Sequence, residues 1–494
     1  MANPSESETP QPAKDDDRPA PADDIVTTNH TLTIKRQKLR YTARTGRVVL
    51  RKEVVTDGKF DGHVAKAEVF LTSYTVDDAD PAERPVTFAF NGGPGSSSVW
   101  LHLGLLGPRR VVAGDVGALE PPPYRLTDNQ ETLLRHSDLV FIDPVSTGYS
   151  RPAEGEKPDD YHGFTGDVES VGEIIRLWTS RNGRWLSPKF LAGESYGTLR
   201  AAALAEHLQS RYGMYLNGLI LISAVLDFAT IRFTGDNDLP YSLFLPTYAS
   251  IAHYHGVHDD RPLDDVLREA EEFAERDYPL ALARGARLPA EERRAVVARL
   301  ATLTGLSPDY IDRVDLRIEH LRFFAELLRD RKLIVGRLDA RFTGPDVDYG
   351  KEQITADPSM AAMAGPYTAA LNHYVRAELE YANDLPYEII NTEAHKAWSY
   401  QEFENKHVSV VDKVSAAMRA NPHLRLHVGL GYTDGATPYF AAEHTLAHLA
   451  IPDELRQNIT RAYYPAGHMM YVHEPSRLRQ SADLAEFVRS ASNR

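Results

Sequence analysis

A five-residue motif, G-x-S-x-G at Gly193–Gly197, constrains the fold of this chain more than any other feature. The residues before it, KFLA, have the apolar character of a short buried strand, and TLRAAALAEHL after it is typical of a helix. A strand, a tight turn and a helix in this order form a nucleophile elbow, which lifts a serine hydroxyl clear of a sheet. The motif therefore predicts an α/β fold with Ser195 as a nucleophile. A plain strand–helix connection with a capping serine is the simpler alternative.

A serine hydroxyl needs a base and a group that orients the base, because it is a weak nucleophile at neutral pH. In a hydrolase sheet these residues follow the serine in the order Asp or Glu, then His. Asp434 follows the apolar run Leu424–Gly429, and His468 follows the next strand-like run. Both positions are ends of consecutive strands, where open α/β sheets place their ligands. The sequence therefore predicts the triad Ser195, Asp434 and His468.

Other late histidines offer alternative bases. His444 and His448 lie one helical turn apart and are typical of residues on a helix face. His473 follows His468 closely and is a weaker alternative.

A glycine-rich loop, Asn91–Ser98 (NGGPGSSS), follows the strand-like run VTFAF. Three glycines within five residues free backbone amides to point at an oxygen atom. A phosphate-binding loop is excluded because no GK[ST] follows. We expect the amides of Gly93 and Tyr196 to form an oxyanion hole, worth about 3–4 kcal/mol per donor.

The pattern along the chain predicts four parts. Short strands with tight turns come first, then strands alternate with helices, which favours a mostly parallel sheet with an antiparallel N-terminal section. A long helical block interrupts this alternation, which resumes near the C-terminus. The first 24 residues hold five prolines and no aromatic or branched aliphatic residue, so they are predicted to be disordered. The predicted parts are a disordered tail at 1–28, a first core segment at 29–226, a helical cap insertion at 227–399 and a second core segment at 400–494.

Composition narrows the function. Asp and Glu number 70 against 55 Lys and Arg, a net charge of −15, which disfavours nucleic acid and anionic membranes as partners. The chain has no cysteine, so disulfides, thiolate nucleophiles and cysteine-ligated metal sites are excluded. It also shows no apolar run of membrane-spanning length and no signal-peptide pattern, so we expect a cytoplasmic location.

Taken together, the motifs resemble those of the serine carboxypeptidase family, which has an α/β-hydrolase fold. Four blocks occur in the family's order, and the resemblance extends from about Thr31 to the C-terminus. The blocks are NGGPGSSS at Asn91–Ser98, DPVSTGYS at Asp143–Ser150, GESYG at Gly193–Gly197 and AGHMMY at Ala466–Tyr471.

The resemblance implies an α/β-hydrolase core with a helical cap, no metal or cofactor, and a peptide with a free C-terminus as substrate. It maps Ser195, Asp434 and His468 to the triad, and Gly93 and Tyr196 to the oxyanion amides. Further residues are expected to contact the substrate: Asn91 and Glu194 at its C-terminal carboxylate, with help from the amide of Gly92, and Met469 at the wall of the leaving-residue pocket.

Two departures separate this chain from most members of the family. Ala89 stands where a tryptophan is usual, and Leu105 stands where many members carry a glutamate that supports carboxylate binding. The absence of cysteine suggests a bacterial branch. An esterase or acyltransferase using the same triad is the first alternative, and an inactive binding protein is the second. The sequence leaves open whether the chain forms a homo-oligomer.

Overall fold

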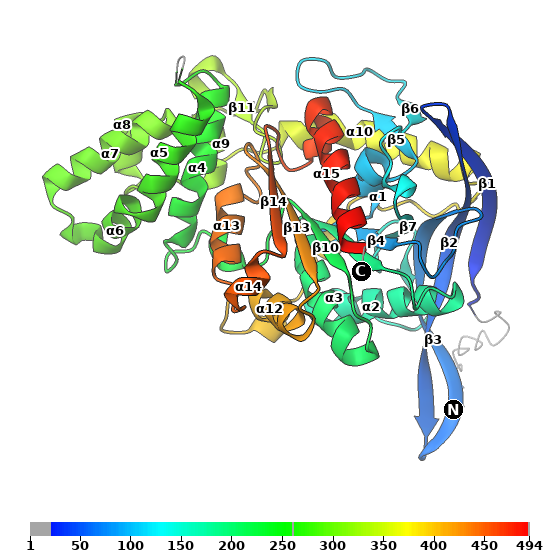
Figure 1. Cartoon of the computed structure of the whole chain (residues 1–494). Helices are drawn as coiled ribbons and strands as arrows, with labels where there is room; N and C mark the ends of the chain where they lie inside the picture. Colours follow the sequence, from blue (N-terminus) through cyan, green and yellow to red (C-terminus); the bar gives the residue numbers. More distant parts are fainter. Residues whose placement is uncertain (1–20, 259–260, 493–494) are drawn as a thin grey trace, which may run out of the picture.

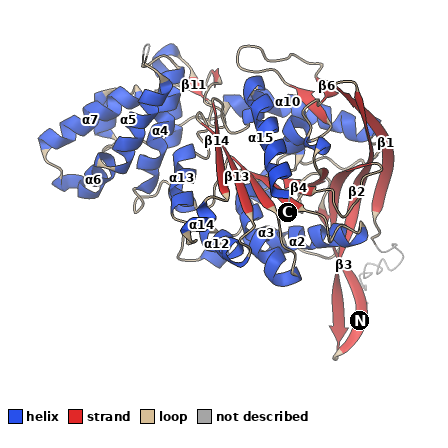
Figure 2. Ribbon diagram, in the orientation of Figure 1, coloured by secondary structure: helices blue, strands red, loops and turns tan. Residues whose placement is uncertain are grey.

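The computed structural model describes residues 21–258 and 261–492, and its centre is a ten-stranded sheet (Figures 1 and 2). The order across the sheet is β1-β2-β3-β7-β4-β9-β10-β13-β14, with β8 paired to β3. Two small two-stranded sheets, β5-β6 and β11-β12, stand apart from it. The strands are β1 Asp24–Ile34, β2 Gln37–Thr56, β3 Lys59–Val76, β4 Val86–Phe90, β5 Arg109–Val112, β6 Arg125–Asp128, β7 Asp138–Ile142, β8 Arg151–Pro152, β9 Lys189–Glu194, β10 Gly218–Ile222, β11 Ile334–Val335, β12 Thr343–Gly344, β13 Arg425–Gly431 and β14 Ile459–Tyr464.

The sheet has two sections that match the two strand patterns in the sequence. β1, β2 and β3 are long and antiparallel, and β3 pairs antiparallel with β7. From β7 to β14 every neighbouring pair is parallel. Strands β4, β7, β9 and β10 are buried along their whole length, as expected of parallel strands covered on both faces.

Helices cover both faces of this sheet. α2, α3 and α12 pack together on one face, and α15, α10 and the short π-helix at His102–Leu106 lie on the other. The α-helices are α1 Val99–Leu101, α2 Phe164–Arg181, α3 Tyr196–Tyr212, α4 Leu239–Tyr254, α5 Leu263–Glu275, α6 Asp277–Arg284, α7 Ala290–Thr304, α8 Pro308–Arg313, α9 His320–Glu326, α10 Pro358–His373, α11 Thr392–Ala397, α12 Val411–Ala420, α13 Tyr439–Ala447, α14 Asp453–Arg456 and α15 Glu474–Ser492.

Helices α4 to α9 form a separate lobe beside the sheet, at the left of Figure 1. The lobe has its own apolar core, in which Tyr248 stacks on Phe323 with ring centroids 4.2 Å apart. Helix α4 of the lobe packs against α13, which belongs to the rest of the molecule. Ser307 caps α8 by accepting a hydrogen bond from the Tyr310 amide, as its position before Pro308 predicts.

The block predicted as one helical insertion, 227–399, divides into two parts. Its first part is the lobe. α10, in its second part, leaves the lobe and packs against α1, β5 and β6, where Tyr367 and Leu371 join the apolar core on one face of the sheet. Helical periodicity shows where a helix lies in the chain but not which neighbour its apolar side packs against. The sequence pattern therefore does not separate the lobe helices from α10.

The N-terminal boundary also differs from the prediction. Residues 1–20 lie outside the described residues, but β1 begins at Asp24, inside the segment predicted as a tail up to residue 28. Asp24 to Thr28 pair with β2, and the β-branched residues Ile25 and Val26 in this stretch pack against the apolar clusters of the core.

The parallel section of the sheet positions the candidate site. Asn91 follows β4, Ser195 follows β9, Asp434 lies three residues beyond β13, and His468 lies four residues beyond β14. Parallel strands end at the same edge of a sheet, so these four residues gather along one edge.

Candidate active site

Ser195 occupies the turn between β9 and α3 in a strained conformation. Its φ is +60° and its ψ is −130°, a region that non-glycine residues seldom adopt. The amide of Ser195 donates to the carbonyl of Ile222 (3.0 Å), and its carbonyl accepts a hydrogen bond from the Thr198 hydroxyl (2.7 Å). A Cβ atom on Gly193 would lie 2.1 Å from the Gly197 carbonyl oxygen, so the turn requires glycine there. The geometry is that of the predicted elbow.

Asp434 and His468 form a buried pair. His468 Nδ1 lies 2.8 Å from Asp434 Oδ2. The Thr437 hydroxyl donates to the same oxygen (2.7 Å), and the amides of Ala436 and Thr437 donate to Asp434 Oδ1 (2.9 Å each). Three donors from its own loop therefore fix the carboxylate that orients the imidazole.

The backbone of His468 is also fixed, by groups from two other segments. Its amide donates to the carbonyl of Leu338 (2.6 Å), and its carbonyl accepts a hydrogen bond from the Ser223 hydroxyl (2.6 Å). Burial, the largest influence, works to lower the pKa of His468. The nearby carboxylates of Asp434 and Glu194 outweigh it, so the pKa lies above its ordinary value.

Ser195 and His468 line the same cavity, of about 280 Å³. Within the described residues no hydrogen bond joins the Ser195 hydroxyl to the imidazole. Such contacts often tighten only when substrate binds. Arg337, Leu338 and Met360, which follow the helical lobe in the chain, form part of the wall.

The two predicted oxyanion donors, the amides of Gly93 and Tyr196, lie where the glycine-rich loop meets the first turn of α3. Gly93 lines the cavity with a φ of +102°, and no hydrogen bond among residues 21–258 and 261–492 uses its amide. Tyr196 is the first residue of α3, where amides lack an intrahelical acceptor. A Cβ on Gly92 would lie 2.5 Å from the Tyr196 nitrogen, so only glycine lets the loop approach the helix this closely.

Glu194 and Asn91 also meet in this cavity. Asn91 Nδ2 donates to Glu194 Oε1 (3.0 Å), while Asn91 Oδ1 accepts a hydrogen bond from the Leu101 amide (3.1 Å). The Tyr471 hydroxyl donates to Glu194 Oε2 (2.8 Å). Sequence reasoning assigned no role to Tyr471, although it ends the AGHMMY motif.

Burial raises the pKa of Glu194 to about 7. His468 and the hydrogen bonds from Tyr471 and Asn91 hold the pKa down, and the Asp434 charge adds to the rise. Near neutral pH this carboxyl group therefore exists in both protonation states. Leu105, at the position where a second carboxyl was expected in relatives, is buried and apolar.

The other predicted contact residues, Gly92 and Met469, line the cavity as well. The structure thus gathers all nine predicted site residues: Ser195, Asp434, His468, Gly93, Tyr196, Asn91, Gly92, Glu194 and Met469. Sequence reasoning missed Thr437, Tyr471 and Arg337. The first two lie close to triad residues in the chain, but Arg337 is brought to the site only by the fold.

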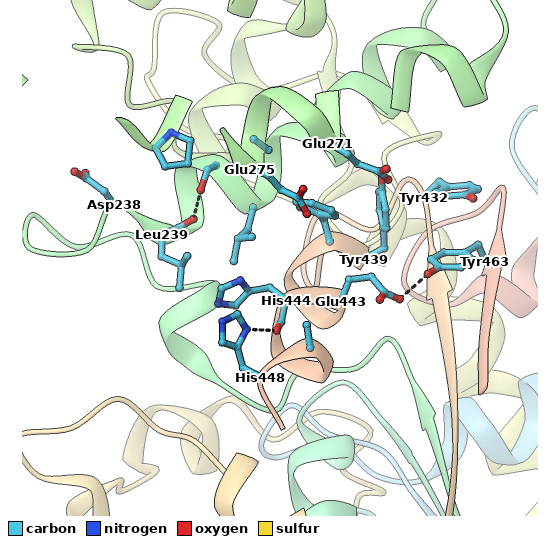
Figure 3. Close-up of a pocket in the computed structure, with 16 residues that line it drawn as sticks. Asp238, Leu239, Glu271, Glu275, Tyr432, Tyr439, Glu443, His444, His448 and Tyr463 are labelled. Atoms are coloured by element: carbon cyan, nitrogen blue, oxygen red, sulfur yellow. Dashed lines mark hydrogen bonds between the residues drawn. The ribbon is translucent and has the colours of Figure 1, made fainter. Parts of the chain in front are cut away.

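A larger cavity, of about 860 Å³, lies between α4, α5 and α13 (Figure 3). It is lined by the alternative bases His444 and His448, whose ring centroids are 4.1 Å apart. None of the described residues of the GESYG and AGHMMY motifs lines it. The third alternative base, His473, bonds through Nδ1 to Ser476 Oγ (2.7 Å) near the start of α15. The cavity at Ser195 is therefore the candidate active site.

The described part of the chain has neither a metal-binding cluster nor a membrane-spanning helix. No group of three or more histidine or acidic side chains there could hold a metal ion. No helix there is long and apolar enough to cross a bilayer.

Comparison with known proteins agrees with the motifs. The sequence profile of the serine carboxypeptidases matches residues 62–478, which is most of the chain. The chain belongs to the serine carboxypeptidase family. The resemblance predicted from the four motifs is therefore confirmed at the level of the family.

Similar proteins within the family include plant sequences. Serine carboxypeptidase-like 5 of Arabidopsis thaliana is 31% identical over 150 residues, 28% of this chain and 32% of the relative. Serine carboxypeptidase-like 13 of the same plant is 29% identical over 170 residues, 32% of this chain and 37% of the relative. The matched stretches thus span only part of the length of these relatives.

A solved structure shows the same fold. The crystal structure of Kex1(delta)p, a prohormone-processing carboxypeptidase from Saccharomyces cerevisiae, covers 92% of this serine carboxypeptidase family member and 92% of its own chain. The TM-score is 0.54 at 14% sequence identity. The predicted α/β-hydrolase fold, with a mostly parallel central sheet, is confirmed.

Proposed function

We propose that this protein is a serine carboxypeptidase that releases C-terminal residues from peptides through an acyl-enzyme on Ser195. One observation carries the proposal: a single cavity is lined by Ser195, by His468 with Asp434 paired behind it, and by the buried Glu194–Asn91 pair. The first set of groups suits acyl transfer, and the second suits recognition of a terminal carboxylate.

The proposed reaction uses the triad in its usual roles. His468 takes the proton of the Ser195 hydroxyl as the oxygen attacks the scissile carbonyl, and the amides of Gly93 and Tyr196 stabilise the oxyanion. His468 then gives the proton to the leaving amine, and water releases the acyl group. Asp434 holds the imidazole in the tautomer that this sequence of steps requires.

Recognition of the substrate's C-terminus depends on the protonation state of Glu194. An ionised Glu194 would repel the substrate carboxylate, whereas a protonated Glu194 can donate a short, charge-assisted hydrogen bond to it. Asn91 and the amide of Gly92 are placed to add further donors. Because the pKa of Glu194 is about 7, free-acid peptides should be cleaved best on the acidic side of neutrality.

Leu105 favours a second candidate function. It places an apolar side chain where many relatives keep a carboxyl, so the selection for a free C-terminus is weaker. An esterase or acyltransferase would use the same triad and oxyanion amides and would not depend on Glu194. An inactive binding protein is the least favoured alternative, because the Asp434–His468 pair is fully assembled.

The deciding experiment is the pH profile of kcat/KM for an N-blocked dipeptide, its amide and its ester, in the wild type and in Glu194→Gln. A carboxypeptidase should lose activity on the free acid as Glu194 ionises, while amide and ester rates follow His468 and persist at higher pH. Profiles that coincide for all three substrates and do not change in Glu194→Gln would favour the esterase. Failure of a fluorophosphonate probe to label Ser195 would favour the binding protein.

Two further parts of the proposal rest on the absence of cysteine. They are membership of a bacterial branch of the family and a cytoplasmic site of action. Both fit a chain that folds without disulfides.

A further inference from the structure

Arg337 places an unpaired positive charge in the wall of the active-site cavity. The residue lies between β11 and β12 and lines the cavity together with Ser195, Glu194 and His468. Among residues 21–258 and 261–492, no ion pair or hydrogen bond involves its guanidinium group. Most arginines of this chain that are less than one-third exposed do have a carboxylate partner, for example Arg200 with Asp167 (2.7 Å).

The cavity's own carboxylates are engaged elsewhere. Asp357 accepts hydrogen bonds from the backbone amides of Arg337 (3.2 Å) and Leu338 (3.0 Å), and from the amide of Ser359 (2.9 Å). Glu194 is bonded to Asn91 and Tyr471. A half-buried guanidinium without a partner retains five unused donors, arranged in a fork that fits a carboxylate.

The segment that carries Arg337 is rigidly attached to the catalytic histidine loop. The carbonyl of Leu338 accepts the His468 amide (2.6 Å), and the Thr433 hydroxyl donates to Asp339 Oδ1 (3.1 Å). Asp339 is in turn paired with Arg341 (2.6 Å). The backbone of Arg337 is therefore fixed, and only its side chain is free to meet a substrate.

The position relative to His468 indicates which part of the substrate Arg337 meets. His468 gives its proton to the leaving amine, so the residue that leaves lies over the His468 side of the cavity. Leu338 and Met469, both next to His468 in space, form that side together with Arg337. The α-carboxylate of the leaving residue already has Glu194 and Asn91 as candidate partners.

We propose that Arg337 selects peptides whose C-terminal residue is Asp or Glu, by pairing with the side-chain carboxylate of that leaving residue. The proposal rests on the carboxypeptidase function and names its substrate class. It extends that function, because the triad and the Glu194–Asn91 pair explain cleavage and recognition of the terminus but not a preference among side chains.

The test compares three N-blocked dipeptides that differ only in the C-terminal residue: Glu, its neutral isostere Gln, and Lys. A wild-type enzyme that uses Arg337 should have a kcat/KM about tenfold or more higher for Glu than for Gln, because a carboxylate on arginine is a charge-assisted, bidentate contact. Arg337→Met should remove this ratio, Arg337→Lys should keep part of it, and Arg337→Glu should favour Lys.

A matched control is Arg331→Met, which removes an exposed arginine six residues earlier that does not line the cavity. It should leave the Glu/Gln ratio unchanged. Because the Arg337 side chain has no partner among the described residues, Arg337→Met should melt at the wild-type temperature. A matching circular dichroism melt would show that lost selectivity is not unfolding.

Three outcomes would overturn the assignment. The first is an equal wild-type kcat/KM for the Glu and Gln peptides. The second is a kcat/KM that changes by the same factor for all three peptides in Arg337→Met, because Arg337 would then contact the α-carboxylate that all three share. A preference that appears only when Glu is the penultimate residue would move Arg337 to the acyl side and also refute it.

Calorimetric binding to Ser195→Ala separates this proposal from the carboxypeptidase function. Ser195→Ala could bind the Glu peptide more tightly than the Gln peptide in a way that depends on Arg337, while the wild type cleaves neither peptide. That result would support the selectivity of Arg337 and refute the carboxypeptidase function. Turnover without such preference would do the reverse.

Discussion

Tyr471 donates a 2.8 Å hydrogen bond to Glu194 from a position three residues beyond His468. The two parts of the site, the triad and the carboxylate-recognition pair, are therefore linked through one loop. Gly104 makes room for this contact, because a Cβ there would lie 2.4 Å from the Tyr471 ring. The phenol supplies a donor to Glu194 in a site where Leu105 supplies none.

Tyr471→Phe should shift the pH dependence of cleavage of free-acid peptides. The variant keeps the ring beside Gly104 but removes a hydrogen bond that lowers the pKa of Glu194, so that pKa should rise. Glu194 then stays protonated to higher pH, and the alkaline decline of kcat/KM for a blocked dipeptide should move upward. The amide of the same dipeptide is the control. An unchanged free-acid profile would show that Tyr471 does not act on Glu194.

Glu194→Gln should remove a pH dependence of stability. Burial raises the pKa of Glu194 from 4.5 to about 7, so the folded state holds this proton more tightly than the unfolded chain. Between these values the folded state binds more protons, and the free energy of unfolding falls as pH rises. The fall attributable to Glu194 is at most about 3 kcal/mol and is complete near pH 7.

The measurement is urea unfolding of the wild type and Glu194→Gln at pH 4.5 and pH 7.5. The glutamine variant should gain stability relative to the wild type at the higher pH. Other titrating groups are common to both proteins and cancel in the difference. If that difference is the same at both pH values, Glu194 binds its proton equally well in the folded and unfolded states, and burial does not raise its pKa.

Ser195→Ala and Ser195→Gly should lose activity alike but differ in stability. Removing a triad nucleophile typically costs ~10⁶-fold in kcat. Alanine keeps the strain of the +60° φ, which is worth about 1–3 kcal/mol, whereas glycine relieves it and adds less than about 1 kcal/mol of unfolded-state entropy. Ser195→Gly should therefore unfold at a higher urea concentration than Ser195→Ala. The reverse order would contradict the strain, and a folded variant that keeps most of its activity would contradict the nucleophile.

Local sequence signals were enough to find the residues that lie just after strands. Ser195, Asp434 and His468 each follow a short apolar run, and the parallel arrangement of those runs brings them to one edge of the sheet. The apolar run Leu424–Gly429 coincides with β13 to within two residues at each end. Here the chemistry and the local pattern point to the same positions.

Contacts between distant segments could not be predicted in this way. Arg337 reaches the cavity because the segment after the lobe bonds to His468 through Leu338, and no periodicity reports such a contact. Packing also overrides local propensity in α4, which continues through Pro246 because its apolar residues are buried in the core of the lobe.

Asp434→Asn should disable the base while leaving the fold largely intact. An asparagine can accept the same hydrogen bonds from the loop amides at Oδ1, but its amide group presents donors to His468 Nδ1 and favours the wrong tautomer. Loss of this orientation costs ~10⁴-fold in kcat in serine hydrolases. Burial, which lowers the pKa of His468, would no longer be offset by the Asp434 charge, so that pKa should fall.

The matched control is Thr437→Val, which removes the 2.7 Å hydrogen bond to Asp434 Oδ2 but keeps the carboxylate and its charge. A hydrogen bond to a charged group contributes about 1.5–3 kcal/mol, so kcat should fall by about 10- to 100-fold, well short of the loss in Asp434→Asn. The acid limb of kcat/KM reports the pKa of His468 and should move to lower pH in Asp434→Asn while changing little in Thr437→Val. Equal losses in the two variants would mean that the hydroxyl, and not the charge of Asp434, holds the imidazole in place. An acid limb that moves upward in Asp434→Asn would mean that His468 is not the group whose ionisation limits the reaction.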